Sequence, residues 1–387
     1  MGQACWQPPN TSVLVVRDTL TAGRAVFART NSLPGAHVLS TSANLSPLAH
    51  VILRPYRKEV CTHCFLYDRG REWKIRDLAV GATFCSPDCE VDWRRHNDDI
   101  CLEAFRASET FVKASMKKRS KHAAEPDGPQ QLITISSIDG DKVSVGWSNT
   151  KRLGESIIRS RESDKPSKTN RAILRNTCDL APDPDILTYT VSGVLAAYKA
   201  RNSIPTEHLN TDTASGLLPS LFQLAIDPHV FITTPTTMSP LEDYTSSYLV
   251  LLAILPSSLL PYITTDLITN LASRASHNAF SIRPEGTTDG NQSGEFLGWG
   301  VWPEASFFNH SCRPNVSKER KGRIWEFRIG SEEGVRGVEN RQQLCITYLG
   351  GDERDLDVVE RRKRLREQWG FTCQCDRCVE ESGERGT

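Results

Sequence analysis

The first thirty residues show the pattern of a strand pair. The β-branched segment Val13–Val16 is followed by the dipeptide Ala22-Gly23 and then by Val26 and Phe27. Apolar β-formers on both sides of a glycine favour two strands joined by a turn. We therefore predict a strand, a turn and a second strand within residues 12–29.

From about residue 185 to residue 280 the apolar positions follow a helical spacing instead. Residues three or four positions apart mark one face, namely Tyr244, Tyr248, Leu251, Leu252 and Leu255. Pro256 comes next and cannot continue a helix. We expect helices here that bury this face in the core.

Strand spacing returns towards the C-terminus. Apolar side chains alternate with polar ones in two runs, Trp325, Phe327, Ile329 and Leu344, Ile346, Tyr348. A charged helix over Val358–Trp369 should end at Gly370. Its basic run Arg361–Arg364 is predicted to form its solvated face. Strands near both ends with helices between them predict an α+β fold.

Between these regions lies a polar stretch, Lys113–Asn170. Within it Ile133–Ile135 and Val143–Val145 flank Asp139-Gly140-Asp141, which predicts a β-hairpin in a surface insertion. The basic run Lys117–Lys121 fits a nuclear signal, a nucleic-acid patch or a solvated loop. Charge runs of this kind are usually solvated, so we favour the loop.

Length and charge limit the function further. The chain has 387 residues, enough for two or three domains, and 47 basic residues balance 47 acidic ones. No net charge therefore attracts the protein to nucleic acid or to an anionic membrane. The longest apolar run, Tyr248–Leu255, is too short to span a bilayer, and the N-terminus lacks a secretory signal. We expect a nuclear or cytoplasmic protein without a membrane partner.

The twelve cysteines are strongly grouped. Cys61-x2-Cys64 and Cys85-x3-Cys89 form two close pairs, the spacing that a tetrahedral structural zinc site requires. Ser86 can cap a helix that carries Cys89 and continues past Trp93. The alternative is two chance pairs of reduced cysteines, which we consider much weaker. Three further cysteines, Cys373, Cys375 and Cys378, cannot complete a tetrahedral site by themselves.

The most specific string is Asn309-His310-Ser311-Cys312-x-Pro314-Asn315. With Ile346-Thr347-Tyr348 and the last three cysteines downstream, it resembles a SET domain with its post-SET zinc site. The segments CTHCF and FCSPDC, followed by W-x2-H and a trailing cysteine, resemble a MYND zinc finger. This order resembles the SMYD group of protein lysine methyltransferases, and most of all the short fungal forms that lack the C-terminal helical-repeat domain.

The resemblance implies a SET β-fold interrupted by other modules. The expected divisions are the N-terminal part of the SET domain (12–57), the MYND-like finger (58–104), a polar insertion with a hairpin (105–184), a helical insert (185–276), the SET core (277–350) and the post-SET segment (351–380).

The resemblance also implies the zinc ligands. A complete MYND finger holds two zinc ions, but the second ligand pair of the family pattern is missing between Phe65 and Phe84. We expect one zinc, bound by Cys61, Cys64, Cys85 and Cys89, with His96 and Cys101 left as a packed remnant. Cys312 is implied as the fourth ligand of the post-SET zinc.

The implied function is methyl transfer from S-adenosylmethionine to a lysine of a protein substrate, with histones as one candidate. Gly23 and Arg24 would approach the methionine end of the cofactor, Asn309 and His310 would bind it, and Phe371 would stack on its adenine. Tyr348 would be the catalytic tyrosine, and Phe280 and Trp369 would line the lysine channel. The MYND-like finger could dock a partner peptide.

Some positions depart from the family pattern. Ala25 replaces the second glycine of the cofactor loop, and Trp369 replaces a channel tyrosine, which suggests the hypothesis of a restricted, monomethylating channel. The alternative function is an inactive scaffold whose finger binds peptides of partner proteins. A DNA-binding zinc protein fits poorly, because the finger lacks a basic reading helix, and we expect no direct DNA binding.

Overall fold

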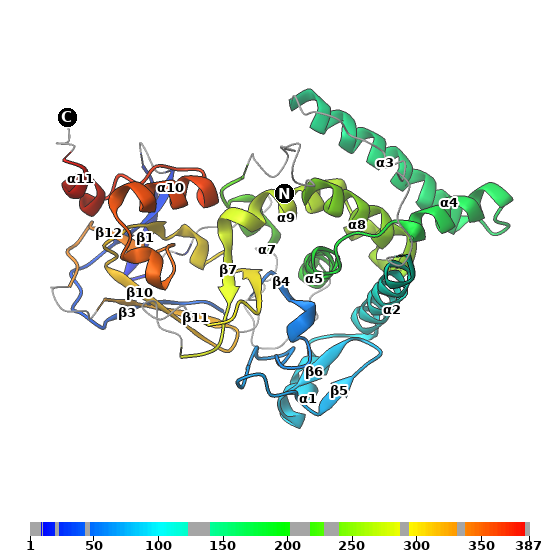
Figure 1. Cartoon of the computed structure of the whole chain (residues 1–387), viewed down its shortest axis with the longest axis horizontal. Coiled ribbons are helices and arrows are strands. Elements are labelled where there is room, and N and C mark those ends of the chain that lie inside the picture. Colours follow the sequence, from blue (N-terminus) through cyan, green and yellow to red (C-terminus); the bar gives the residue numbers. More distant parts are fainter. Residues whose placement is uncertain are drawn as a thin grey trace.

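The computed structural model describes residues 9, 11–19, 23–42, 47–122, 140–201, 217–227, 240–286, 294–330 and 337–383. Small β-sheets lie on one side of the molecule, with helices on the other, and a compact finger projects below them (Figure 1). This arrangement is an α+β fold, as the sequence pattern predicts.

The strands come from both ends of the chain. They are β1 (Leu14–Asp18), β2 (Arg24–Ala28), β3 (His37–Ser40), β4 (Ala49–Ile52), β5 (Ile75–Asp77), β6 (Ala82–Phe84), β7 (Ala279–Ile282), β8 (Gly298–Val301), β9 (Asn309–His310), β10 (Val316–Lys321), β11 (Ile324–Ile329) and β12 (Gln343–Ile346). The predicted strand pair is confirmed, because β1 and β2 are antiparallel with Val16 opposite Val26.

Sheet order joins segments that are far apart in the sequence. The four sheets have the orders β1-β2-β12-β9, β10-β11-β3, β4-β8-β7 and β5-β6. The pair β12–β9 is parallel and places Cys345 beside Asn309 and Ile346 beside His310. The Asn-His motif therefore lies next to the strand that leads into Tyr348.

Helices cover the sheets and form the opposite side of the molecule. They are α1 (Pro87–Arg95), α2 (Asp99–His122), α3 (Gly140–Glu162), α4 (Lys168–Asp179), α5 (Pro184–Arg201), α7 (Leu217–Phe222), α8 (Pro240–Ile254), α9 (Thr265–Asn278), α10 (Val358–Trp369) and α11 (Asp376–Ser382), with 3₁₀ turns η1 (Arg54–Tyr56), η3 (Ser257–Tyr262), η4 (Ala305–Phe307) and η5 (Gly351–Arg354). The last long helix has the predicted bounds, and Gly370 ends it in the left-handed region at φ 74°.

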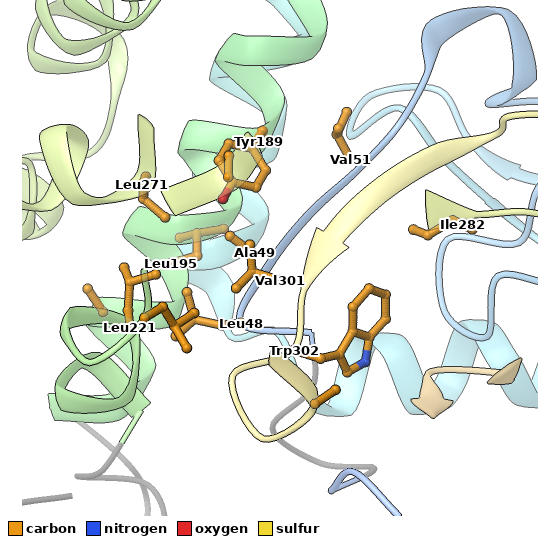
Figure 2. Close-up of a cluster of buried hydrophobic side chains, with 14 of the residues drawn as sticks. Leu48, Ala49, Val51, Tyr189, Leu195, Leu221, Leu271, Ile282, Val301 and Trp302 are labelled. Carbon is orange, nitrogen blue, oxygen red and sulfur yellow. The ribbon is translucent and has the colours of Figure 1, made fainter. Parts of the chain in front are cut away.

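The core joins the β4-β8-β7 sheet to helices α5 and α9 (Figure 2). Leu48, Ala49 and Val301 of the sheet region face Leu195 and Leu271 of the helices. Gly193 lets α5 approach α9 closely, because a Cβ there would lie 2.3 Å from a methyl carbon of Leu271. The helical face predicted around Tyr248 is buried in this core.

The hairpin prediction is wrong for the residues that can be checked. Val143–Val145 lie in α3, whereas Ile133–Ile135 fall outside the described residues. The helical spacing of residues further along α3 outweighs the strand pattern of Val143–Val145. Trp147, Gly154 and Ile157 are buried or half-buried and share the face that packs on the core. Trp147 meets Tyr248 of α8 edge-on, with ring centroids 6.2 Å apart.

Candidate active site and metal centres

Four cysteines of the finger converge on one point. The sulfur atoms of Cys61, Cys64, Cys85 and Cys89 all lie within 4.8 Å of one another. The Cys64–Cys85 separation is 3.6 Å and the Cys85–Cys89 separation is 3.5 Å. Four sulfurs around one zinc at about 2.3 Å lie roughly 3.8 Å apart, so the group fits a tetrahedral zinc.

Local structure explains how the finger cysteines are positioned. Cys85 follows β6, and Cys89 lies in the first turn of α1, where its backbone N–H donates to the predicted cap Ser86 over 3.2 Å. The first pair is tied to β6 by two hydrogen bonds between Thr62 and Thr83, of 2.7 and 3.0 Å. Both pairs are therefore held by backbone contacts.

The thiols of this group have strongly shifted pKa values, and the hydrogen bond with Cys64 lowers the pKa of Cys61 to about 5, which favours a thiolate ligand. Burial, together with the neighbouring Cys61 sulfur, raises the pKa of Cys85 to about 12. Such a thiol stays protonated at neutral pH unless a cation stabilises the thiolate. A zinc ion provides that stabilisation, and its affinity then depends on pH.

His96 and Cys101 do not join this group. Cys101 is buried in the main core, as a packed remnant would be, but His96 is exposed, which corrects that part of the prediction. The reason is that α1 ends at Arg95, so His96 caps the helix, with Nδ1 2.6 Å from the Asp92 carbonyl oxygen. Within the described residues, the geometry offers this finger one four-cysteine site.

A second group of four cysteines joins the C-terminus to the loop after β9. The sulfur atoms of Cys312, Cys373, Cys375 and Cys378 lie within 4.8 Å of one another. Cys312 is 3.5 Å from Cys378 and 4.0 Å from Cys373, which again fits a tetrahedral zinc. The backbone N–H of Cys312 also points to the Cys375 sulfur at 3.4 Å. The fourth cysteine implied by the resemblance is therefore present in the group.

A buried arginine supports this second group, contrary to the predicted solvated face of α10. Arg361 is fully buried, pairs with Glu381 at 2.7 Å and lies 3.8 Å from the Cys378 sulfur. It also donates to the Leu356 carbonyl oxygen. The expectation fails because position 361 of α10 faces the C-terminal tail, where a carbonyl and a carboxylate accept hydrogen bonds from the two terminal guanidinium nitrogens, while the buried Nε has no partner among the described residues.

His310 connects the second cysteine group to Tyr348. Its Nδ1 accepts the backbone N–H of Tyr348 at 2.9 Å, so the ring proton resides on Nε2, which lies 3.2 Å from the Cys312 sulfur. Burial lowers the pKa of His310 to about 4, so the ring is neutral at physiological pH. The imidazole thus bridges the cysteine group and the strand end that carries the tyrosine.

Tyr348 lies in a cavity of about 510 Å³. Its hydroxyl donates to the Phe308 carbonyl oxygen over 2.8 Å, and its ring centroid is 5.5 Å from that of Trp369. Burial, followed by the nearby Cys345, raises the pKa of Tyr348, so the phenol stays neutral. The cavity is also lined by Phe280, Ser281, Phe308, Lys318 and Trp325.

Most of the predicted channel and cofactor residues lie close together around Tyr348. Tyr348, Phe280 and Trp369 line the same cavity. Asn309 and His310 form β9, and Phe371 lies 6.1 Å from His310 and 6.3 Å from Tyr348 between ring centroids. These residues are brought together.

Gly23 and Arg24 lie further along the same sheet. Gly23 has φ 64° and precedes β2, where Ala25 is fully buried. Arg24 lies 5.2 Å over the ring of Phe307, two residues before Asn309, and donates to Gln223 at 2.7 Å. The loop thus approaches the Asn-His motif through Phe307.

Two residues at these sites were missed by the sequence analysis. Lys318 lines the cavity and Arg361 supports the second cysteine group. The sequence held a weak signal for Lys318. Alternate residues of a strand point to the same face, so Lys318 shares its face of β10 with Val316 and Arg320. Arg361 gave no such signal, because its run is basic throughout.

None of the described helices is long and apolar enough to cross a membrane.

The chain is similar to several proteins that are named as methyltransferases or as SET and MYND proteins. The chain is 28% identical over 398 residues to the "Potential protein lysine methyltransferase SET6" of Saccharomyces cerevisiae, covering 95% of each chain. It is 30% identical over 133 residues to the "Histone-lysine N-methyltransferase ASHR2" of Arabidopsis thaliana, covering 32% of this chain and 31% of that protein. It is 34% identical over 110 residues to a "SET and MYND domain-containing protein" of Dictyostelium discoideum, covering 28% and 20%. No family model matches the chain.

These findings confirm the resemblance to SET and MYND proteins, including a fungal one aligned along almost its whole length. The names support the methyltransferase class and do not favour an inactive scaffold.

Proposed function

Because the chain resembles SET and MYND domain methyltransferases, we propose that it is an S-adenosylmethionine-dependent protein-lysine N-methyltransferase. One observation carries the proposal: Tyr348, two residues after β12, contacts His310 of the neighbouring strand β9 and lines a cavity that has both aromatic and charged residues in its walls. We assign the cavity to the acceptor side chain and, following the resemblance, the Asn309-His310 strand to the cofactor.

The acceptor amine must be neutral to act as a nucleophile, although a free lysine has a pKa of about 10.4. Phe280, Phe308 and Trp369 provide apolar walls around Tyr348. Removing the amine from water disfavours its charged form and so lowers its pKa. S-adenosylmethionine supplies the methyl group on its sulfonium when it is bound.

Tyr348 is suited to orienting this amine. Its proton is donated to the Phe308 carbonyl oxygen, so the phenolic oxygen keeps its lone pairs as acceptors. An amine that donates a hydrogen bond to this oxygen has its own lone pair directed elsewhere, towards the cofactor side. Holding the two reactants in line supplies most of the acceleration in such a transfer.

We assign two zinc ions to the two cysteine groups, with the ligands Cys61, Cys64, Cys85, Cys89 in the finger and Cys312, Cys373, Cys375, Cys378 at the C-terminus. The second zinc would order the tail that follows Trp369 and Phe371, since metal binding to such groups contributes directly to folding. The finger zinc would hold the docking surface for a partner peptide.

The remaining roles follow the resemblance. We assign Gly23, Arg24, Asn309, His310, Tyr348 and Phe371 to the cofactor. The substrate is a protein with a target lysine, histone or non-histone, and the protein acts in the nucleus or the cytoplasm.

The proposal is tested by calorimetric titration of zinc-loaded protein with S-adenosylmethionine. We expect micromolar binding. Asn309→Ala should weaken it by at least about tenfold, because the substitution removes the side-chain amide that we assign to hydrogen bonding with the cofactor. Asn149→Ala serves as the matched control, since Asn149 is exposed on α3. Lack of binding by folded wild-type protein that carries two zinc ions would refute the proposed function.

A further inference from the structure

Lys318 faces inward from β10, although lysines are rarely directed towards a core. Ser317, Glu319 and Lys321 on the opposite face of the strand are exposed. Lys318 is half-buried, and it follows the same face as the buried Val316. A charge in such a position costs free energy unless partners compensate it.

The partners of Lys318 are found in the cavity around Tyr348. Its Nζ donates to the Thr347 carbonyl oxygen at 2.8 Å and lies 5.9 Å from the centre of the Phe280 ring. A carbonyl oxygen and an aromatic face are the contacts that an alkylammonium ion seeks. The chain's own lysine therefore uses contacts that a cationic ligand of this cavity would otherwise make.

Occupation of this position has two consequences for an incoming side chain. The cavity lining also carries the carboxylates of Glu285, Glu319, Asp352 and Glu353, but like charges repel, so a second cation is disfavoured at the contacts that Lys318 itself makes. Lys318 also covers one face of Phe280, which leaves less room for methyl groups on an acceptor nitrogen. Primary, monomethyl and dimethyl amines can lose a proton and so avoid the repulsion, whereas a trimethylammonium group is permanently charged and also needs the most room.

We propose that Lys318 is a specificity-determining residue of the acceptor cavity, one that disfavours trimethyllysine and so stops transfer short of the trimethyl product. The inference rests on the proposed function, because it takes the cavity to be the site of the acceptor. It gives a physical basis for restricted methylation that does not depend on Trp369.

A binding experiment tests the role of Lys318 without requiring catalysis. The probe is Nα-acetyl-trimethyllysine amide, titrated into the zinc-loaded full chain and followed by NMR or calorimetry. Lys318→Met should bind the probe at least about tenfold more tightly than the wild type, because the repulsion is removed and the Phe280 face is opened. Lys318→Arg keeps the charge and should bind as the wild type does.

Lys321→Met is the matched control. Lys321 lies on the same strand but is 54% exposed and pairs with Glu326 at 2.9 Å, so its loss should leave probe binding unchanged. Lys318→Gln provides a second neutral variant if the methionine variant fails to fold, as judged by zinc content and thermal unfolding.

Mass spectrometry of methylated protein substrate gives the second readout. We expect no trimethyllysine from the wild type and trimethyllysine from Lys318→Met. Probe binding by both neutral variants within twofold of the wild type would overturn the inference, whatever the cofactor titration shows. If the neutral variants gain affinity but S-adenosylmethionine does not bind, the proposed function fails while the cation-excluding role of Lys318 stands.

Discussion

At the scale of single residues, Arg361 shows how strongly surroundings decide the role of a charge. Arg361 and Arg364 belong to the same basic run on α10, yet the first is fully buried and the second is 45% exposed. Arg361 holds Glu381 of the C-terminal tail beside the second cysteine group. A charge that ties two segments together in this way contributes more than an exposed pair does.

We expect Arg361→Met to lower the free energy of unfolding by about 1.5–3 kcal/mol, because a charged hydrogen bond is lost and the Leu356 carbonyl loses its donor. Glu381 is 37% exposed, so water screens its attraction to Arg361, and we expect a value towards the lower end of this range. Urea unfolding of the zinc-loaded protein measures the change.

Arg364→Met is the control for that measurement. Its side chain pairs at 3.6 Å with Glu360 on the helix surface, and its loss should cost less than about 0.5 kcal/mol. Equal effects of the two substitutions would show that the buried contacts of Arg361 do not stabilise the fold.

At the scale of elements, the segment that follows α10 is held by its cysteines. α10 ends at Gly370, and Phe371 and the three C-terminal cysteines then pass beside the loop after β9. α11 begins directly after Cys375 and is only seven residues long. A helix of this length is unstable on its own, so its order depends on tertiary contacts or on a metal.

We expect Cys312→Ser to reduce the zinc content from two ions per chain to one. The tail over residues 371–383 should then exchange its amide hydrogens faster, because a structural zinc contributes directly to the folding of the segment that binds it. Metal analysis and hydrogen-exchange mass spectrometry measure the two effects.

Cys178→Ser controls for the loss of a thiol as such, because Cys178 is exposed on α4 and belongs to neither cysteine group. Two zinc ions in the Cys312→Ser protein, with unchanged exchange in the tail, would remove Cys312 from the ligand set.

At the scale of the whole molecule, His50 lies where the β4 strand, helix α5 and the finger meet. Its backbone N–H donates to Ser192 Oγ at 3.1 Å, and its ring lies 5.1 Å from that of Phe65 in the finger. Arg323, from the turn between β10 and β11, lies over the same Phe65 ring, 4.7 Å from its centroid. It also donates to the His63 carbonyl oxygen at 3.1 Å. The finger is thus packed against the hairpin whose strands also line the cavity.

This junction should make the protein sensitive to acid. Burial, and then the charges of Arg323 and Lys199, hold the pKa of His50 well below its ordinary value of 6.5. Below about pH 6.5 the unfolded chain binds a proton at His50 while the folded chain does not. The contribution of His50 is therefore complete above that pH and is lost as the pH falls towards the lower folded-state pKa.

We expect the free energy of unfolding to fall between pH 6.5 and 5 by about 1 kcal/mol per pH unit more in the wild type than in His50→Gln. Comparing the two slopes separates His50 from acid effects common to both proteins, such as loss of zinc. His37→Gln, at an exposed position, should retain the wild-type slope. A wild-type slope in His50→Gln would contradict the prediction.

Features that depend on residues close together in the chain could be predicted before the fold was known. The strand pair at the N-terminus, the Ser86 cap, the end of α10 at Gly370 and the pairing of cysteines in the finger follow from local spacing. The family resemblance predicted that Cys312 belongs to the second cysteine group and that Tyr348, Phe280 and Trp369 lie close together. In the structure Cys312 is in that group, and the three aromatic residues line one cavity. The roles assigned to these residues remain predictions.

Tertiary structure alone decided the features that depend on distant neighbours. Val143–Val145 have strand propensity, yet they lie in a helix whose later turns pack against α8. Arg361 is buried beside Glu381 and Leu356, which accept hydrogen bonds from its two terminal nitrogens. Lys318 faces the cavity because Thr347 and Phe280, 29 and 38 positions away and belonging to other sheets or their ends, pack beside it in the folded chain. A linear pattern reports the charge of a residue, but its effect depends on the partners that folding brings within a few ångströms.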